Sequence, residues 1–142
     1  MRFANLSQEA TQRLWDTWKY LVRESLDEFN EDVFLGRAIV RENNYWERPY
    51  LVLETNKGYL YIFPMPGDEF TLRLYRNKLD KQTLSSKSTT KQSDRESPIG
   101  TIHLIINLID ERYYPLSMAL REFLAEGLRR LYQKYWARLS SL

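Results

Sequence analysis

Two hydrophobic periodicities follow one another between residues 99 and 142, and they constrain the fold more than any other feature. The first has the two-residue period of a strand, with one face made of Ile102, Leu104, Ile106 and Leu108 and the other of His103, Ile105, Asn107 and Ile109. The second has helical spacing and comprises Leu116, Leu120, Phe123, Leu124, Leu128, Leu131, Tyr135 and Leu139. Pro115 suits the first turn of this helix, where its missing N–H is not needed. The pattern predicts a strand followed by a helix of about 25 residues that packs on the sheet.

An amphipathic pattern near the start of the chain predicts another helix, over residues 7–29. Ser7 is the expected N-cap, and Glu9 lies in the first turn, where the helix dipole favours an acid. The buried stripe consists of Leu14, Trp18, Leu21, Val22, Ser25 and Phe29, and Trp15 and Leu26 widen it to one side. We expect this face to pack against the core.

Four further strands are predicted between the two helices, over residues 33–41, 50–55, 59–63 and 70–75. Asn56-Lys57-Gly58 and Pro64-Met65-Pro66-Gly67 mark two of the turns. Connections this short join antiparallel neighbours. The fold class is therefore α+β, an antiparallel sheet of about five strands flanked by an N-terminal and a long C-terminal helix, in a single domain over residues 1–142.

Residues 76–98 differ in kind from the rest, because they are rich in Ser, Thr and Lys and poor in apolar side chains. A segment of this length and composition predicts a mobile polar loop. It would suit phosphorylation or contact with an anionic partner, but a tolerated insertion is the interpretation we favour.

Gly127 lies inside the predicted last helix, where a glycine costs about 1 kcal/mol relative to alanine. We therefore expect another element to pass close to it. The first helix, with Trp15 or Trp18 against the glycine, is the simplest candidate, and a second subunit is the alternative.

Little in the sequence favours an enzyme. The chain has no cysteine and one histidine, His103, so disulfides are excluded and a zinc or non-haem iron site is not expected. Its five glycines are too far apart for a phosphate-binding loop, and no serine-nucleophile motif is present. We assign no catalytic, cofactor-binding or metal-ligating residue and expect no cofactor.

Charge and hydropathy limit where the protein can be located and which partners it can bind. The longest apolar runs are far too short to cross a membrane, so we expect a soluble, cytoplasmic protein without membrane contact. The net charge of +2 is unevenly distributed: residues 27–32 carry four acids and no base, whereas the polar loop and the last helix are basic. Such a small net charge does not by itself indicate nucleic-acid binding.

Aromatic and Arg side chains are interleaved along the predicted strands. The candidate binding residues are Arg37, Arg41, Trp46, Arg48, Tyr59, Tyr61, Arg73 and Tyr75. Such a surface suits a protein interface, stacking of single-stranded bases, or simply the edges of the core. Our first hypothesis is a small non-enzymatic binding, adaptor or assembly protein of chaperone-like type, with a protein partner and a homodimeric state. The alternative is a nucleic-acid-binding protein that uses the basic loop, the basic C-terminal helix and the strand aromatics.

Overall fold

The computed structural model of this chain describes residues 2–43, 49–67, 69–79, 97–105 and 116–137. Within these ranges the chain begins with helix α1 (Arg2–Phe34) and continues through five strands. They are β1 (Ile39–Asn43), β2 (Tyr50–Thr55), β3 (Gly58–Met65), β4 (Glu69–Tyr75) and β5 (Gly100–Ile105). Helix α4 (Leu116–Leu131) follows, and the π-helical turn η2 (Tyr132–Trp136) extends it.

The five strands form one antiparallel sheet in chain order, β1-β2-β3-β4-β5, which confirms the predicted fold class. The β2–β3 hairpin has the two-residue loop Asn56-Lys57, with Thr55 opposite Gly58. The Thr55 hydroxyl accepts a hydrogen bond from the N–H of Lys57 at 3.1 Å and donates one to the carbonyl of Gly58 at 2.8 Å. The predicted turn residues therefore fix the register of the central strands.

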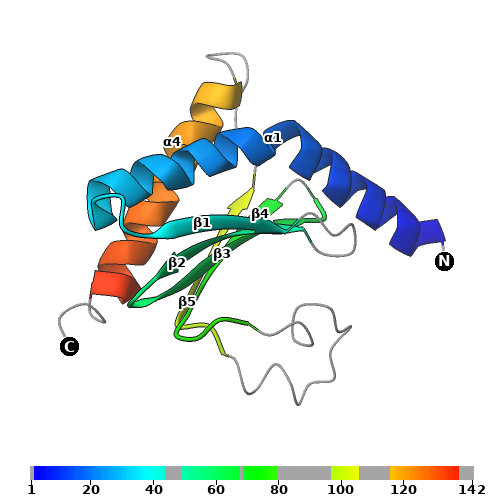
Figure 1. The fold of residues 1–142 in the computed structure, drawn as a ribbon. Coiled ribbons are helices and arrows are strands. Elements are labelled where there is room, and N and C mark those ends of the chain that lie inside the picture. The colour runs from blue at the N-terminus through cyan, green and yellow to red at the C-terminus, as the bar shows by residue number, and fades with distance from the viewer. Residues whose placement is uncertain (1, 44–48, 68, 80–96, 106–115, 138–142) are drawn as a thin grey trace.

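The two helices cover one face of the sheet (Figure 1). Helix α1 packs on β1, β2 and β3, whereas α4 packs on β5 and on α1. The side chains buried between the two layers are apolar and include Trp15, Val22, Leu26, Leu53, Leu60, Ile62, Phe70, Leu72, Leu74, Leu124 and Leu128. Trp15 and Leu26, which the sequence placed beside the stripe of the first helix, lie at its fully buried centre.

Helix α1 is longer than predicted at both ends. It begins at Arg2, so Ser7 is an internal residue and the N-cap assignment is wrong. It ends at Phe34, so residues 33 and 34 of the predicted first strand are helical and that strand begins at Ile39. Val33 and Phe34 extend the apolar stripe and pack against the core, and this burial outweighs the strand preference of a β-branched and an aromatic residue.

The C-terminal helix changes from α-helical to π-helical geometry after Leu131. The α-helical part has 16 residues rather than about 25, and five residues of π-helix follow. A π turn has i→i+5 hydrogen bonds, so the buried position after Leu131 is Trp136 rather than Tyr135. The Trp136 ring lies 4.9 Å from that of Phe34 and 6.1 Å from that of Phe29, and so closes the core against α1.

Gly127 does have a close neighbour, but it is not the first helix. A Cβ at this position would lie 3.3 Å from a terminal methyl group of Leu104, on β5. The expected crossing by α1 with Trp15 or Trp18 is therefore wrong, because it is the strand that approaches α4 here.

A second apolar cluster occupies the other face of the sheet. Its buried members are Val52, Tyr61, Phe63, Tyr75 and Leu79. Leu79 follows β4 and belongs to the segment predicted as a mobile loop, yet its backbone N–H donates a 3.0 Å hydrogen bond to the Tyr61 hydroxyl. The start of that segment is therefore part of the folded body, whereas residues 80–96 lie outside the described residues.

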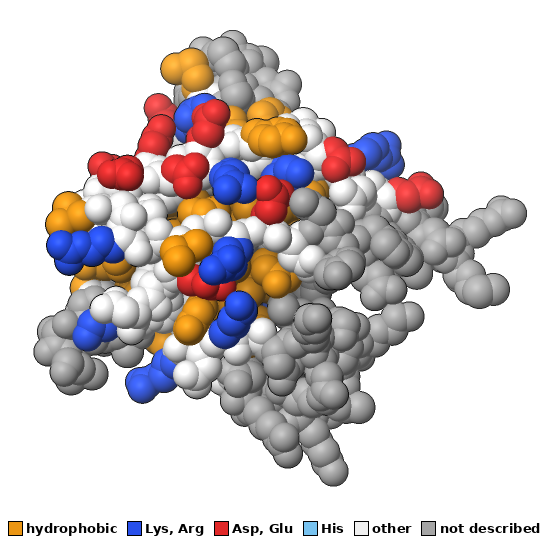
Figure 2. All heavy atoms as spheres, viewed as in Figure 1, with side chains coloured by type: hydrophobic (Ala, Val, Ile, Leu, Met, Phe, Trp, Pro, Cys, Tyr) orange, Lys and Arg blue, Asp and Glu red, His pale blue; other side chains and the backbone are white. Residues whose placement is uncertain are grey.

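Acidic side chains gather along α1 (Figure 2). Asp27, Glu28, Glu31 and Asp32 are exposed, as the acidic segment of the sequence suggested. Arg121 of α4 forms ion pairs with Glu24 and Glu28, so part of this charge joins the two helices. Within the described residues, no helix is long and apolar enough to cross a membrane.

Candidate functional site

In the connection from α1 to β1, an apolar residue has an unusual backbone conformation. Leu35 has a φ of 56° and Gly36 a φ of 74°. Glycine adopts such values freely, but a left-handed conformation costs a residue such as Leu about 1–2 kcal/mol. The Leu35 side chain is nevertheless 72% exposed. The fold therefore displays an apolar side chain at the end of α1 in a conformation that disfavours it locally.

Asn30 fixes the start of β1 from within α1. Its buried side-chain amide donates to the carbonyl of Ala38 at 2.9 Å and accepts the N–H of Ala38 at 3.0 Å. The carbonyl of Asn30 also accepts the N–H of Gly36 at 3.1 Å. Both backbone groups of Ala38 are thus satisfied by one side chain, which holds the connection in place.

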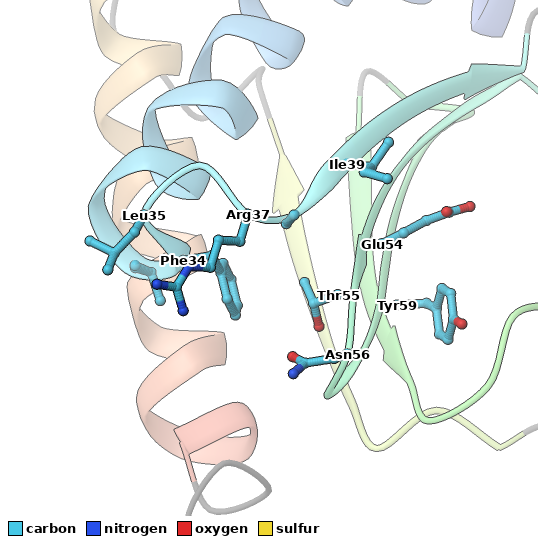
Figure 3. A pocket seen from close by; sticks show the side chains of 10 residues that line it. Phe34, Leu35, Arg37, Ile39, Glu54, Thr55, Asn56 and Tyr59 are labelled. Atoms are coloured by element: carbon cyan, nitrogen blue, oxygen red, sulfur yellow. The ribbon is translucent and has the colours of Figure 1, made fainter.

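A cavity of about 570 Å³ lies between this connection and the β2–β3 hairpin (Figure 3). We call it the cleft. Its apolar lining comprises Val33, Phe34, Leu35, Ala38 and Ile39. Its polar lining comprises Arg37, Glu54, Thr55, Asn56 and Tyr59. Ile39 is 50% exposed, so the apolar side chains at the cleft remain accessible to a ligand. The volume falls within the range of small-ligand pockets.

The acid in the cleft wall is already neutralised. The Glu54 carboxylate accepts a 3.0 Å hydrogen bond from Arg41 and forms an ion pair with Lys78 at 3.2 Å. Burial alone would raise the pKa of Glu54, but these two cations hold it below its ordinary value of 4.5. Glu54 is therefore a structural anion that ties β1 and the segment after β4 to β2.

Arg37 has a different environment. It is exposed at the cleft, and no described residue forms an ion pair or a hydrogen bond with its guanidinium group. A guanidinium presents a planar fork of donors that matches a carboxylate or phosphate group. Arg37 is consequently a cation that an anionic ligand group can reach beside the apolar lining.

The aromatic residues predicted on the strands do share one face, but two of them are covered. The register places Tyr59 opposite Tyr75 and Tyr61 opposite Arg73. Tyr61 and Tyr75 are buried in the second cluster, so they are not an exposed stacking surface. Burial raises the pKa of Tyr61 to about 12, although the hydrogen bond from Leu79 acts to lower it.

The eight predicted site residues are therefore divided by the fold. Arg37 and Tyr59 line the cleft, and Arg41 adjoins it through Glu54. Arg73 is half-buried on the outer face of β4, away from that group. Tyr61 and Tyr75 belong to the core, and Trp46 and Arg48 lie outside the described residues.

The sequence did not reveal the apolar half of the cleft. Phe34, Leu35 and Ile39 were all assigned to one predicted strand, whereas they come from a helix end, a turn and a strand. Gly36 lies within that predicted strand, and a glycine can also mark a helix C-terminus in the left-handed conformation. This is the signal that could have located the turn.

His103 lies on the outer face of β5 beside two polar side chains. Its Nδ1 is 2.6 Å from a Glu69 oxygen and 3.2 Å from the Thr71 hydroxyl. A catalytic relay needs the acid and the nucleophile on opposite ring nitrogens, and here both approach the same one. Among the residues that the structure describes, no three His, Cys, Asp or Glu side chains are grouped to hold a metal ion.

Comparison with known proteins does not identify a relative. No protein-family model, characterised protein or solved structure matches this chain.

Proposed function

We propose that this chain is a small non-enzymatic binding protein whose cleft takes up a short segment of a partner protein. The segment carries a bulky apolar side chain next to a carboxylate. The observation that supports the proposal is the placement of the unpaired Arg37 guanidinium near the exposed side chain of Leu35, in the lining of a cleft that also includes the exposed Ile39.

The apolar and the charged parts of the cleft have separate roles. An apolar side chain that covers the exposed Leu35 or Ile39 gains roughly 25 cal/mol per Å² of apolar surface removed from water. The carboxylate supplies orientation through a two-pronged hydrogen bond to Arg37. Glu54 stays paired with Arg41 and Lys78, so it does not compete for Arg37.

A peptide partner fits this cleft better than a nucleic acid does. Base stacking needs exposed rings, and Tyr61 and Tyr75 are buried. Arg41, one of the candidate binding residues on the strands, is already paired with Glu54. The cleft retains one unpaired arginine beside apolar side chains in a mixed lining, and this suits an acidic, apolar peptide.

The test is a selection of peptides from a random displayed library on the full-length chain, followed by fluorescence anisotropy on the selected sequences. We expect enriched peptides with an acid adjacent to a large apolar residue. Arg37→Ala should weaken their binding roughly tenfold or more, because loss of a charge-assisted contact changes the binding free energy by about 1.5–3 kcal/mol.

Two controls make the result specific. Arg129→Ala removes an exposed arginine from α4 and should leave peptide affinity unchanged. Ile39→Ser should weaken binding without altering its salt dependence, since it removes an apolar contact. Equal affinity of the wild type and Arg37→Ala would contradict the proposal. Binding of a single-stranded oligonucleotide in place of peptides, with steep loss on added salt, would instead support the nucleic-acid alternative.

A further inference from the structure

Asn56, in the β2–β3 hairpin, lacks both of the usual structural reasons for an asparagine in a tight turn. Asparagines in turns tolerate a positive φ, or their side chains form hydrogen bonds with the nearby backbone. Asn56 does not have a positive φ, and in this turn that conformation belongs to Gly58. The side chain that bonds to the turn backbone is that of Thr55. The turn therefore leaves the Asn56 amide unused.

This amide is accessible at the cleft. Asn56 is exposed and belongs to the cleft lining. Its amide points away from the hairpin, toward the side on which Phe34 and Arg37 lie (Figure 3). Within the described part of the chain, no group forms a hydrogen bond with the Asn56 side chain. It therefore offers a ligand a donor and an acceptor side by side.

The neighbouring polar groups of the cleft cannot replace this amide. The Glu54 carboxylate is paired with two cations, and the Thr55 hydroxyl is bonded within the turn. The Tyr59 hydroxyl has a single oxygen, so it cannot contact the N–H and the C=O of one residue in parallel, as a primary amide does. Asn56 is thus suited to a contact that needs both groups together.

Asn30 shows within this chain how one such amide binds a backbone residue. It donates to the carbonyl of Ala38 at 2.9 Å and accepts the N–H of Ala38 at 3.0 Å. A peptide segment that enters the cleft removes its own backbone N–H and C=O groups from water, and these groups need partners once buried. Asn56 can supply both partners to one residue of that segment.

We propose that Asn56 makes the cleft specific for an extended peptide, by pairing its side-chain amide with the backbone N–H and C=O of one bound residue. The inference rests on the proposed peptide binding and adds the conformation of the peptide. A residue inside a helix already has both groups bonded within the helix, so the contacted residue is extended. Arg37 binds the carboxylate from the α1–β1 connection, and Asn56 binds the backbone from the hairpin.

The first test measures fluorescence anisotropy of a selected peptide whose binding depends on Arg37, with the full-length chain. Asn56→Ala should weaken binding roughly three- to tenfold, the range expected when hydrogen bonds between neutral groups are lost. The matched control is Gln133→Ala, which removes an exposed side-chain amide outside the cleft lining and should leave the affinity unchanged. Circular dichroism verifies that each variant is folded.

N-methylated analogues of the same peptide identify the contact without depending on one protein variant. Each analogue carries a methyl group on one backbone nitrogen and so lacks that N–H. One analogue should bind the wild type roughly three- to tenfold more weakly than the parent peptide does. With Asn56→Ala this difference should disappear, because the partner of that N–H is already absent.

The possible failures are distinguishable. Suppose that Arg37→Ala weakens a peptide that Asn56→Ala binds as tightly as the wild type does: this inference is then overturned, and the proposed function stands. N-methyl penalties that are identical in the wild type and Asn56→Ala would overturn it as well, because the side chain would then act only by packing. If no selected peptide depends on Arg37, both the proposed function and this inference fail.

Discussion

Gly100 is the position at which a single absent side chain matters most for packing. It pairs with Leu74 on the helix-covered face of the sheet, and a Cβ there would overlap the ring of Tyr135. A strand glycine at such a site permits the close approach of another element. The sequence contains both residues but does not show that the ring of Tyr135 packs on Gly100.

Gly100→Ala should destabilise the protein by about 1–3 kcal/mol, because Tyr135 must leave its place on the strand. Urea unfolding measures the loss. In a Tyr135→Ala background the same substitution should have much less effect, since the ring is gone. An equal loss in both backgrounds would show that the ring is not the obstacle.

Glu54 makes the stability of the fold depend on pH. Its pKa is lowered in the folded state, so its carboxylate stabilises the protein above the ordinary value of 4.5, and that contribution disappears as the pH falls through the lowered pKa. Glu54→Gln should therefore be less stable than the wild type at neutral pH, and the difference should shrink in acid. Thermal unfolding measured from pH 7 to pH 3 provides the check. A difference that does not change with pH would mean that the loss comes from packing rather than charge.

Helix α4 is the element whose sequence most clearly predicted a neighbour. Gly127 was expected to accommodate a helix, whereas it accommodates the side chain of Leu104. The methyl groups of a leucine can shift by a few tenths of an ångström more easily than a helix backbone can. This difference changes the outcome expected for a larger residue.

Gly127→Ala should alter the free energy of unfolding by less than about 1 kcal/mol, because the gain in helix propensity offsets the tight contact with Leu104. When Leu104 is already alanine, the same change should stabilise the protein by about 1 kcal/mol. Chemical unfolding of the four variants in this cycle measures both values. A large loss in the Leu104→Ala background would reveal a different neighbour.

The segment directly after β4 contributes to the stability of the fold through two side chains. Leu79 is buried in the second cluster and hydrogen-bonded to Tyr61, and Lys78 is paired with Glu54. Leu79→Ala should therefore destabilise the protein by about 2–5 kcal/mol, as for other buried leucines. Arg76, three residues earlier and exposed, provides the control, since Arg76→Ala should change stability by no more than about 0.5 kcal/mol. Melting temperatures compare the two variants. If both substitutions change stability equally little, Leu79 does not contribute to the stability of the fold.

At the scale of the whole molecule, the sheet is covered on both sides rather than on one. Thr71 lies on the face opposite to Leu72, and it is 1% exposed and hydrogen-bonded to His103. Helices cover one face, and the second cluster with Leu79 covers part of the other. Substitutions at the buried positions of either face should consequently be severe.

Ile62 and Phe63 are adjacent in β3 and point to opposite faces, so they form a matched pair. Ile62→Ala should cost about 2–5 kcal/mol and Phe63→Ala about 3–5 kcal/mol, since each leaves a cavity in a closed cluster. Equilibrium unfolding in denaturant compares them directly. A small loss for Phe63→Ala alone would mean that the outer face is open to water.

The sequence by itself determined the number and order of the strands, the hairpin at Asn56-Lys57 and the two amphipathic helices. Hydrophobic period and turn chemistry are local properties, so residues close in the chain specify them. The tertiary structure alone decided where α1 ends, which aromatic ring follows Leu131 into the core, and that Tyr61 is buried while Arg37 is exposed. The burial of Tyr61 depends on Leu79, and the packing of Phe34 at the end of α1 depends on Trp136, both distant in sequence. A period shows which side chains share a face, but only the assembled fold determines what covers that face.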